Sequence, residues 1–133
     1  MFTLDRFLDR DTYPLTFLPL CEVRLKKGTA GNPWLILVPQ RPGLVELHDL
    51  SLEDRRALID EITRATSALK SVCGCEKINV ASFGNMVPQL HIHIIARFSN
   101  DQWWPDPIDM SARPWDWTDD ARIPFCNRLK DTI

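Results

Sequence analysis

The chain has 133 residues, a length typical of a single domain with a buried core. Its formal net charge of -2 argues against the strongly basic surface on which nucleic-acid-binding proteins depend. No apolar run approaches the roughly 20 residues that span a membrane, and the first residues contain no signal-peptide core. We therefore expect one domain over residues 1–133, located in the cytoplasm, with neither nucleic acid nor a membrane as a partner.

The first part of the chain predicts an antiparallel hairpin. Residues 17–25 are typical of a strand with a proline near its start, and residues 26–33 contain two glycines, an asparagine and a proline, as a turn does. Residues 34–38 form an apolar run that Pro39 ends, which indicates a strand buried on both faces. We expect these two strands to pair through a longer loop.

A long amphipathic helix is predicted over residues 51–72. Ser51 with Asp54 three residues later is a helix start of the capping-box type. Apolar residues then recur at spacings of three and four, at Leu58, Ile62, Ala65, Leu69 and Val72. The side expected to face solvent carries Glu53, Arg56, Asp60 and Arg64.

Two further strands follow, over residues 77–83 and 89–95, joined by a short link at 84–88 that favours antiparallel pairing. Strict alternation in the second strand predicts two faces. One face takes Leu90, Ile92, Ile94 and Ala96, and the other takes Gln89, His91 and His93. Because two adjacent imidazoles would repel each other if both were charged, at least one is expected to be neutral near pH 7.

The tail after Phe98 contains four of the five tryptophans. These are Trp103, Trp104, Trp115 and Trp117, interleaved with Pro105, Pro107 and Pro114. Prolines disfavour long regular elements, whereas tryptophans are costly to leave in water. We expect an ordered but irregular tail lying over the body or over a partner subunit. The order of elements predicts an α+β fold with a helix on an antiparallel sheet.

The segment GNMVPQLHIHIIAR resembles the histidine triad (HIT) superfamily of nucleotide hydrolases and transferases, whose signature is three histidines alternating with hydrophobic residues. His91 and His93 match the second and third histidines. Gln89 stands in the first position, as is usual in a bacterial subgroup of the family. The order of Arg41-Pro42 and His48-Asp49-Leu50 before the helix also agrees with the family. The likeness covers a core of about residues 15–98 and leaves 99–133 as the tail. It implies a five-stranded, mainly antiparallel sheet with one long helix, and a homodimer.

The resemblance implies a nucleotide phosphohydrolase or nucleotidyl transferase acting at the α-phosphate of a purine nucleotide conjugate. His91 would be the nucleophile, neutral, with one ring nitrogen held by a backbone carbonyl. His93 would contact the phosphate oxygens, and Gln89 would orient the phosphate without acting as acid or base. The residues implied to bind ribose and phosphate are Asn79, Asn85, Met86 and Val87. No metal or other cofactor is implied.

Two positions depart from the family pattern. Met86 or Val87 stands where relatives place a hydroxyl that assists the leaving group, and Trp34 stands where a further histidine is common. The substrate would be of the dinucleoside polyphosphate or phosphoramidate type. The alternative function is a nucleotide-binding or sensing module with little turnover.

Other interpretations of the same residues stay open at this point. His91 and His93 could lie on a solvated sheet face, or form half of a zinc site completed by His48, a cysteine or an acid. Asn79 could be a polar residue at a sheet edge, and His48 could make only a local bond in its turn. Cys73 and Cys75 are expected to be free thiols, because a disulfide across one residue is strained.

Overall fold

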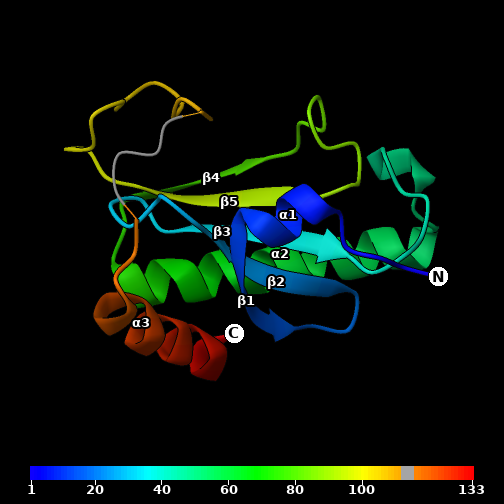
Figure 1. Ribbon diagram of the computed structural model, residues 1–133, viewed down its shortest axis with the longest axis horizontal. Helices are drawn as coiled ribbons and strands as arrows, with labels where there is room; N and C mark the ends of the chain where they lie inside the picture. The colour runs from blue at the N-terminus through cyan, green and yellow to red at the C-terminus, as the bar shows by residue number, and fades with distance from the viewer. Residues whose placement is uncertain (112–115) are drawn as a thin grey trace.

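The computed structural model describes residues 1–111 and 116–133 (Figure 1). A five-stranded antiparallel sheet forms its centre, with the strand order β1-β2-β3-β5-β4. The strands are β1 Thr12–Phe17, β2 Cys21–Lys26, β3 Trp34–Pro39, β4 Lys77–Ala81 and β5 Ile92–Arg97. The expected α+β fold with a five-stranded sheet is confirmed.

The long helix follows the expected pattern closely. Helix α2 (Leu52–Cys73) begins after Ser51, whose hydroxyl accepts a hydrogen bond from the amide of Asp54. It ends at Gly74, whose φ of 67° lies in the left-handed region that glycine adopts without steric cost. The other helical elements are α1 Arg6–Arg10, a 3-10 turn η1 Leu47–Asp49, and α3 Asp119–Thr132.

Each face of the sheet carries its own hydrophobic cluster. Helices α2 and α3 lie side by side and cover one face, where Leu90, Ile92, Ile94 and Ala96 are buried as the alternation predicted (Figure 1). The opposite face, here called the histidine face, is covered by α1 and by part of the tail. Its apolar cluster consists of Leu8, Trp34, Ile36, Val38, Ile95 and Ile108. Strand β3 contributes to both clusters, which confirms that it is buried on both sides.

The hairpin of β2 and β3 is confirmed, but the strand expected over 17–25 is wrong. Pro19 lies in a tight turn in which the Leu18 amide bonds to the Cys21 carbonyl, so that the segment divides between β1 and β2. Strand β1 and helix α1 were not predicted. A buried arginine joins them to the sheet: Arg24 on β2 forms ion pairs with Glu22 and with Asp9 of α1. The β4 and β5 strands pair antiparallel as expected, with Ala81 opposite His93.

The prediction of an irregular tail is wrong for its last part. Helix α3 begins after Thr118, whose hydroxyl accepts from the Ala121 amide, and continues through Pro124. Burial of Phe125 and Leu129 against the α2 face of the sheet holds this helix together despite the missing N–H of the proline. Residues 98–111 contain turns and bends without a helix or strand, whereas Pro114 and Trp115 lie outside the described residues. The ordered packing expected for the Trp-rich tail stays a prediction. The division into a core of 15–98 and a tail stays a prediction.

Among residues 1–111 and 116–133, no helix combines the length and the apolar character that crossing a bilayer requires.

Candidate functional site

The two histidines of the alternating segment lie against each other on the histidine face. Their ring centroids are 4.9 Å apart, in an edge-to-face arrangement. His91 is 7% exposed and His93 is 6% exposed. A solvated sheet face is therefore the wrong interpretation, because both imidazoles are more than nine-tenths buried.

The local hydrogen bond of His91 defines which of its ring nitrogens carries a proton. Nδ1 of His91 lies 2.7 Å from the main-chain oxygen of Gln89. A carbonyl oxygen can only accept, so Nδ1 is the donor and carries the proton. In the neutral ring, Nε2 of His91 then holds a free lone pair, which is the electronic requirement for a nucleophile.

His93 has the opposite arrangement of donor and acceptor. The indole Nε1 of Trp34 donates to Nδ1 of His93 at 2.9 Å. An indole N–H can only donate, so Nδ1 of His93 is the acceptor, and its ring proton lies on Nε2. The pair therefore combines an Nε2 lone pair on His91 with an Nε2–H donor on His93.

The surroundings of His93 keep this imidazole uncharged. Burial lowers the pKa of His93 to about 3, with smaller contributions in the same direction from His91 and Lys26. Lys26 is itself buried, and its Nζ lies 5.4 Å from the centroid of the Trp34 ring. At neutral pH, and with no anion bound, His93 is therefore uncharged and offers Nε2–H as its hydrogen-bond donor.

The side chain of Gln89 binds the N-terminal segment. Its Oε1 accepts from the Asp5 amide at 2.9 Å, and its Nε2 donates to the Thr3 carbonyl at 2.8 Å. One Nε2 hydrogen and one Oε1 lone pair remain for other partners. The Gln89 side chain thus links residues 3–5 to the segment that carries the histidines.

The link between β4 and β5 carries the residues expected at the phosphate. Gly84 has a φ of 81°, which turns the chain before Asn85. Asn85 and Met86 are exposed, Met86 to 93%, and Val87 packs partly against the cluster of the histidine face. Within the described part of the chain, no hydrogen bond has the amide of Asn85, Met86 or Val87 as its donor. Three backbone donors are thus available along this link.

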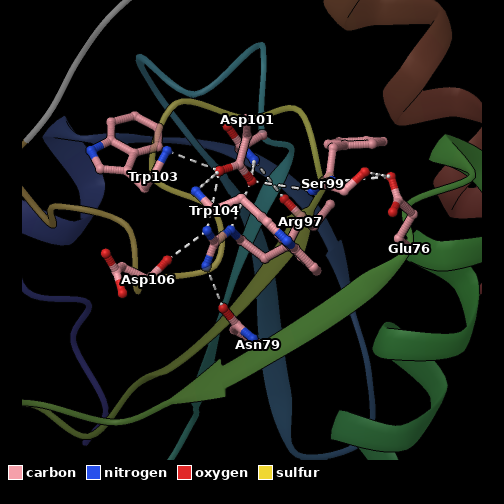
Figure 2. A network of polar contacts seen from close by, with 11 residues as sticks. Glu76, Asn79, Arg97, Ser99, Asp101, Trp103, Trp104 and Asp106 are labelled. Atoms are coloured by element: carbon pink, nitrogen blue, oxygen red, sulfur yellow. Dashed lines mark hydrogen bonds and ion pairs between the residues drawn. The ribbon is translucent and has the colours of Figure 1, made fainter.

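Asn79 belongs to a polar network that the sequence did not reveal (Figure 2). Its Oδ1 accepts from Nη1 of Arg97 at 2.8 Å, which leaves the Nδ2 hydrogens as its remaining donors. Arg97 is only 2% exposed and forms a two-point ion pair with Asp101, at 2.9 Å and 3.1 Å. The Arg97 guanidinium also donates to the main-chain oxygen of Asp106. The Arg97 side chain therefore holds both Asn79 and the segment that follows β5.

The Asp101 carboxylate completes this network. It accepts from the Asn32 amide at 3.0 Å and from the backbone amides of Phe98, Trp103 and Trp104. These hydrogen bonds and the Arg97 guanidinium hold the pKa of Asp101 well below its ordinary value, against the opposing effect of burial. No sequence pattern predicts this contact, because Arg97 ends strand β5 and Asp101 lies in a bend, where the i,i+4 rule for helices does not apply.

The remaining candidate residues form no metal-ligating group among the residues that the structure describes. Among the described residues, no group of three or more potential metal-ligating side chains occurs, so nothing gathers around the histidine pair as a zinc site would require. The His48 side chain is 84% exposed, and its Nε2 lies 3.9 Å from Oδ1 of Asp49. This distance is too long for a hydrogen bond, so the side chain does not make the local bond considered for it. All four cysteines are described, and none forms a disulfide.

Comparison with known proteins gives concordant results. A family model described as the HIT domain matches residues 15–100. A crystal structure of a histidine triad (HIT) protein from Sinorhizobium meliloti 1021 has 39% identity and a TM-score of 0.94, covering 99% of this chain and 97% of that one. A histidine triad protein from Bradyrhizobium japonicum has the same identity and TM-score, covering 99% of this chain and 98% of that one.

A third structure, of a histidine triad protein from Marinobacter aquaeolei VT8, has 35% identity and a TM-score of 0.93, with 99% and 96% of the two chains covered. No curated protein matches the chain. The family model spans more than half of the sequence, and the structural matches exceed 30% identity over nearly the whole chain. This chain belongs to the histidine triad (HIT) family.

Proposed function

We propose that the protein is a nucleotide phosphohydrolase or nucleotidyl transferase that forms a covalent bond between His91 and the α-phosphate of a purine nucleotide conjugate. The HIT domain match and the HIT-protein neighbours support a nucleotide-binding or hydrolase-type function. The substrate would be of the dinucleoside polyphosphate or phosphoramidate type. No metal or other cofactor takes part in the proposed steps.

The complementary hydrogen bonding of the two imidazoles carries this proposal. The Gln89 carbonyl holds Nδ1–H of His91, so the Nε2 lone pair can attack phosphorus. As the P–N bond forms, the bond from phosphorus to the leaving group breaks, and the leaving group takes up a proton from solvent. Water then attacks the same phosphorus and releases a proton to solvent, while the P–N bond breaks and its electron pair returns to Nε2 of His91. The nucleoside monophosphate then leaves. His93 would donate Nε2–H to a phosphate oxygen during both steps.

Backbone groups supply the remaining donors for the phosphate. The amides of Asn85, Met86 and Val87 have no partner within the described residues, and Gly84 permits the turn that brings them together. Successive free N–H groups are a recurrent way of binding anions. In this proposal they hold the oxygens of the α-phosphate while His91 attacks it.

Asn79 is proposed to contact the ribose. Because its Oδ1 is bound by Arg97, the Nδ2 hydrogens are the polar groups that a ribose hydroxyl oxygen would meet. The Gln89 amide keeps one donor and one acceptor free beside its contacts with Thr3 and Asp5. It is proposed to orient the phosphate with that remaining donor.

A nucleotide-binding module with little turnover is the second candidate. Two observations favour it: Met86 offers no hydroxyl to a leaving group, and the Gln89 side chain is already engaged by the N-terminal segment. Such a module would bind AMP without releasing product from any conjugate.

We also propose a homodimer as the functional assembly. Strand β4 lies at one edge of the sheet, and its Val80 is 49% exposed, so an apolar edge is open to a second copy. Light scattering coupled to size-exclusion chromatography tests this, since a monomer across the accessible concentration range would contradict it.

The function is tested by incubating the purified protein with diadenosine polyphosphates and with adenosine phosphoramidate, and by measuring the AMP released. The native protein is expected to release AMP, whereas the His91→Ala variant should bind AMP and release none. Tight AMP binding without turnover by the native protein would favour the binding module. Equal release by both proteins would exclude His91 as the nucleophile.

A further inference from the structure

Trp34 and His93 come together through the register of two neighbouring strands. In the β3–β5 pairing, Trp34 lies opposite Ile95 and His93 lies opposite Ile36, so the two rings are diagonal neighbours on one face of the sheet. Their ring centroids are 5.6 Å apart, with an interplanar angle of 72°. Trp34 is 1% exposed, so its indole has no freedom to turn toward solvent.

The hydrogen bond between them has a fixed direction. The indole Nε1–H of Trp34 can donate a hydrogen bond but cannot accept one. The 2.9 Å contact therefore requires an unprotonated Nδ1 on His93. Moving the ring proton to Nδ1, or adding a second proton there, would set two N–H groups against each other. In a buried site, that would leave both groups without a partner, at a substantial cost in free energy.

The other groups that face His93 add to this effect. His91 lies on one side, with ring centroids 4.9 Å apart, and the Phe83 ring lies 5.7 Å away. The Lys26 ammonium lies over the indole of Trp34, and its positive charge lowers the pKa of His93 further. Neither the charged lysine nor the apolar phenylalanine stabilises an imidazolium at this position.

We propose that Trp34 is a positioning residue of the phosphate site, which holds His93 in the Nε2–H tautomer so that it meets the phosphate as a neutral donor. In this arrangement His93 does not act as a charged acid. The proton taken up by the leaving group then comes from solvent or from the substrate itself. The assignment of the donor to a phosphate rests on the proposed function, whereas the tautomer does not.

The native protein permits a direct test by nuclear magnetic resonance. Long-range proton–nitrogen spectra of the imidazoles should show His93 Nδ1 unprotonated and Nε2 protonated from about pH 7 to about pH 5. A scalar coupling between the Trp34 indole nitrogen and His93 Nδ1 should be visible across the hydrogen bond. A proton on His93 Nδ1, or titration of His93 near its ordinary pKa of 6.5, would overturn the proposal.

Two variants separate the hydrogen bond from simple ring packing. Trp34→Phe keeps an aromatic ring and removes the N–H, and it should raise the pKa of His93 by at least about one unit, a tenfold change in its proton affinity. Phe83→Leu replaces an aromatic ring that packs beside His93 without a hydrogen bond, and it should leave the tautomer of His93 unchanged. The proposal fails if Trp34→Phe leaves both the tautomer and the pKa of His93 as in the native protein. If Trp34→Phe does not fold, the scalar coupling between the Trp34 indole nitrogen and His93 Nδ1 in the native protein still tests the proposal.

Titration with AMP links the tautomer to the phosphate. AMP should shift the Nε2 resonance of His93 in the native protein, and the same shift should be smaller in Trp34→Phe. If His93 carries its ring proton on Nδ1, the inference is overturned, whether or not the protein hydrolyses a nucleotide conjugate. A correct tautomer, with no effect of AMP and no turnover, would instead overturn the proposed function and with it the phosphate role of His93.

Discussion

The side-chain nitrogen of Gln89 donates to the main-chain oxygen of Thr3, at 2.8 Å. The oxygen of the same amide accepts from Asp5, so one side chain pairs with a peptide segment through a donor and an acceptor together. A primary amide offers both groups at one end, whereas an imidazole places its two nitrogens on opposite sides of a ring. Gln89 therefore joins the N-terminal segment to the segment that carries the histidines.

Replacing Gln89 with alanine is expected to release residues 3–5 from the histidine segment. Each of the two lost hydrogen bonds contributes about 0.5–1.5 kcal/mol, so the free energy of unfolding should fall by about 1–3 kcal/mol. Amide exchange at Asp5 should become faster. Urea unfolding and hydrogen exchange measure these effects. Gln102→Ala, at an exposed position of the tail, is the matched control, and equal behaviour of the two variants would contradict the account.

Glu61 is predicted to be essential to the stability of the β1–β2 turn. Its buried carboxylate accepts from the backbone amides of Leu20 and Cys21, both at 2.8 Å. Glu61→Gln would set an NH₂ group against one of these amides, so the free energy of unfolding should decrease by about 2–4 kcal/mol. Asp60→Asn, exposed on the same helix, should change it by less than about 0.5 kcal/mol in urea unfolding. Similar values for both variants would contradict the role given to Glu61.

Asp101 is predicted to make a stabilising contribution that depends on pH. Asp101→Asn leaves the buried charge of Arg97 unpaired and should cost about 3–5 kcal/mol near pH 7. The pKa of Asp101 is lowered in the folded protein, so this stabilisation is complete above the ordinary value of 3.8 and is lost as the pH falls below it.

An exposed ion pair provides the control for Asp101. Asp119 pairs with Arg122, and its side chain is 81% exposed, so Asp119→Asn should change the free energy of unfolding by about 0–1 kcal/mol. Urea unfolding at about pH 7 and about pH 3 should show the difference between native protein and Asp101→Asn shrinking at the lower pH. A difference that stayed constant would mean that the carboxylate charge is unimportant.

His93 should make stability fall as the pH is lowered. In the unfolded chain, the pKa of His93 is near its ordinary value of 6.5, whereas burial lowers it to about 3 in the folded protein. Between these values the unfolded state binds the extra proton, so the free energy of unfolding decreases by up to about 1.4 kcal/mol per pH unit. Above 6.5 this effect is absent. His93→Asn should show a smaller slope than the native protein between about pH 6 and about pH 4, and identical slopes would refute the pKa assignment.

Local signals made much of this fold predictable. The hydroxyl of Ser51 and the glycine at 74 define the ends of α2 through contacts within one helical turn. Period-2 alternation placed His91 and His93 on the face opposite Ile92 and correctly separated the two clusters. Such patterns depend only on neighbouring residues, so the sequence is sufficient to read them.

Two elements were not predicted because they depend on contacts between residues far apart in the sequence, which local patterns do not report. Strand β1 contains Pro14, which is tolerated because β1 is an edge strand, and its register shifts between Pro14 and Thr16. Helix α3 persists through Pro124 because Phe125 and Leu129 are buried. Propensity alone argued against both elements, and tertiary packing overrode it.

The polar contacts of the site also escaped prediction. Trp34 and His93 are 59 residues apart, and their hydrogen bond exists only because the register of β3 and β5 makes them diagonal neighbours. The Gln89 amide meets Thr3 across 86 residues. The sequence could indicate which residue types were available for chemistry, but the tautomer of each histidine required the contacts of the folded chain.

The central claim is that His91 becomes covalently bound to a nucleotide, and trapping that adduct tests it most directly. Protein mixed with a diadenosine polyphosphate or adenosine phosphoramidate would be quenched in alkali, where a phosphorus–nitrogen bond to histidine survives, and analysed by mass spectrometry. We predict a mass increase of one AMP less one water on the peptide containing His91, absent from His91→Ala. AMP release without any adduct, or an adduct on another residue, would contradict the account.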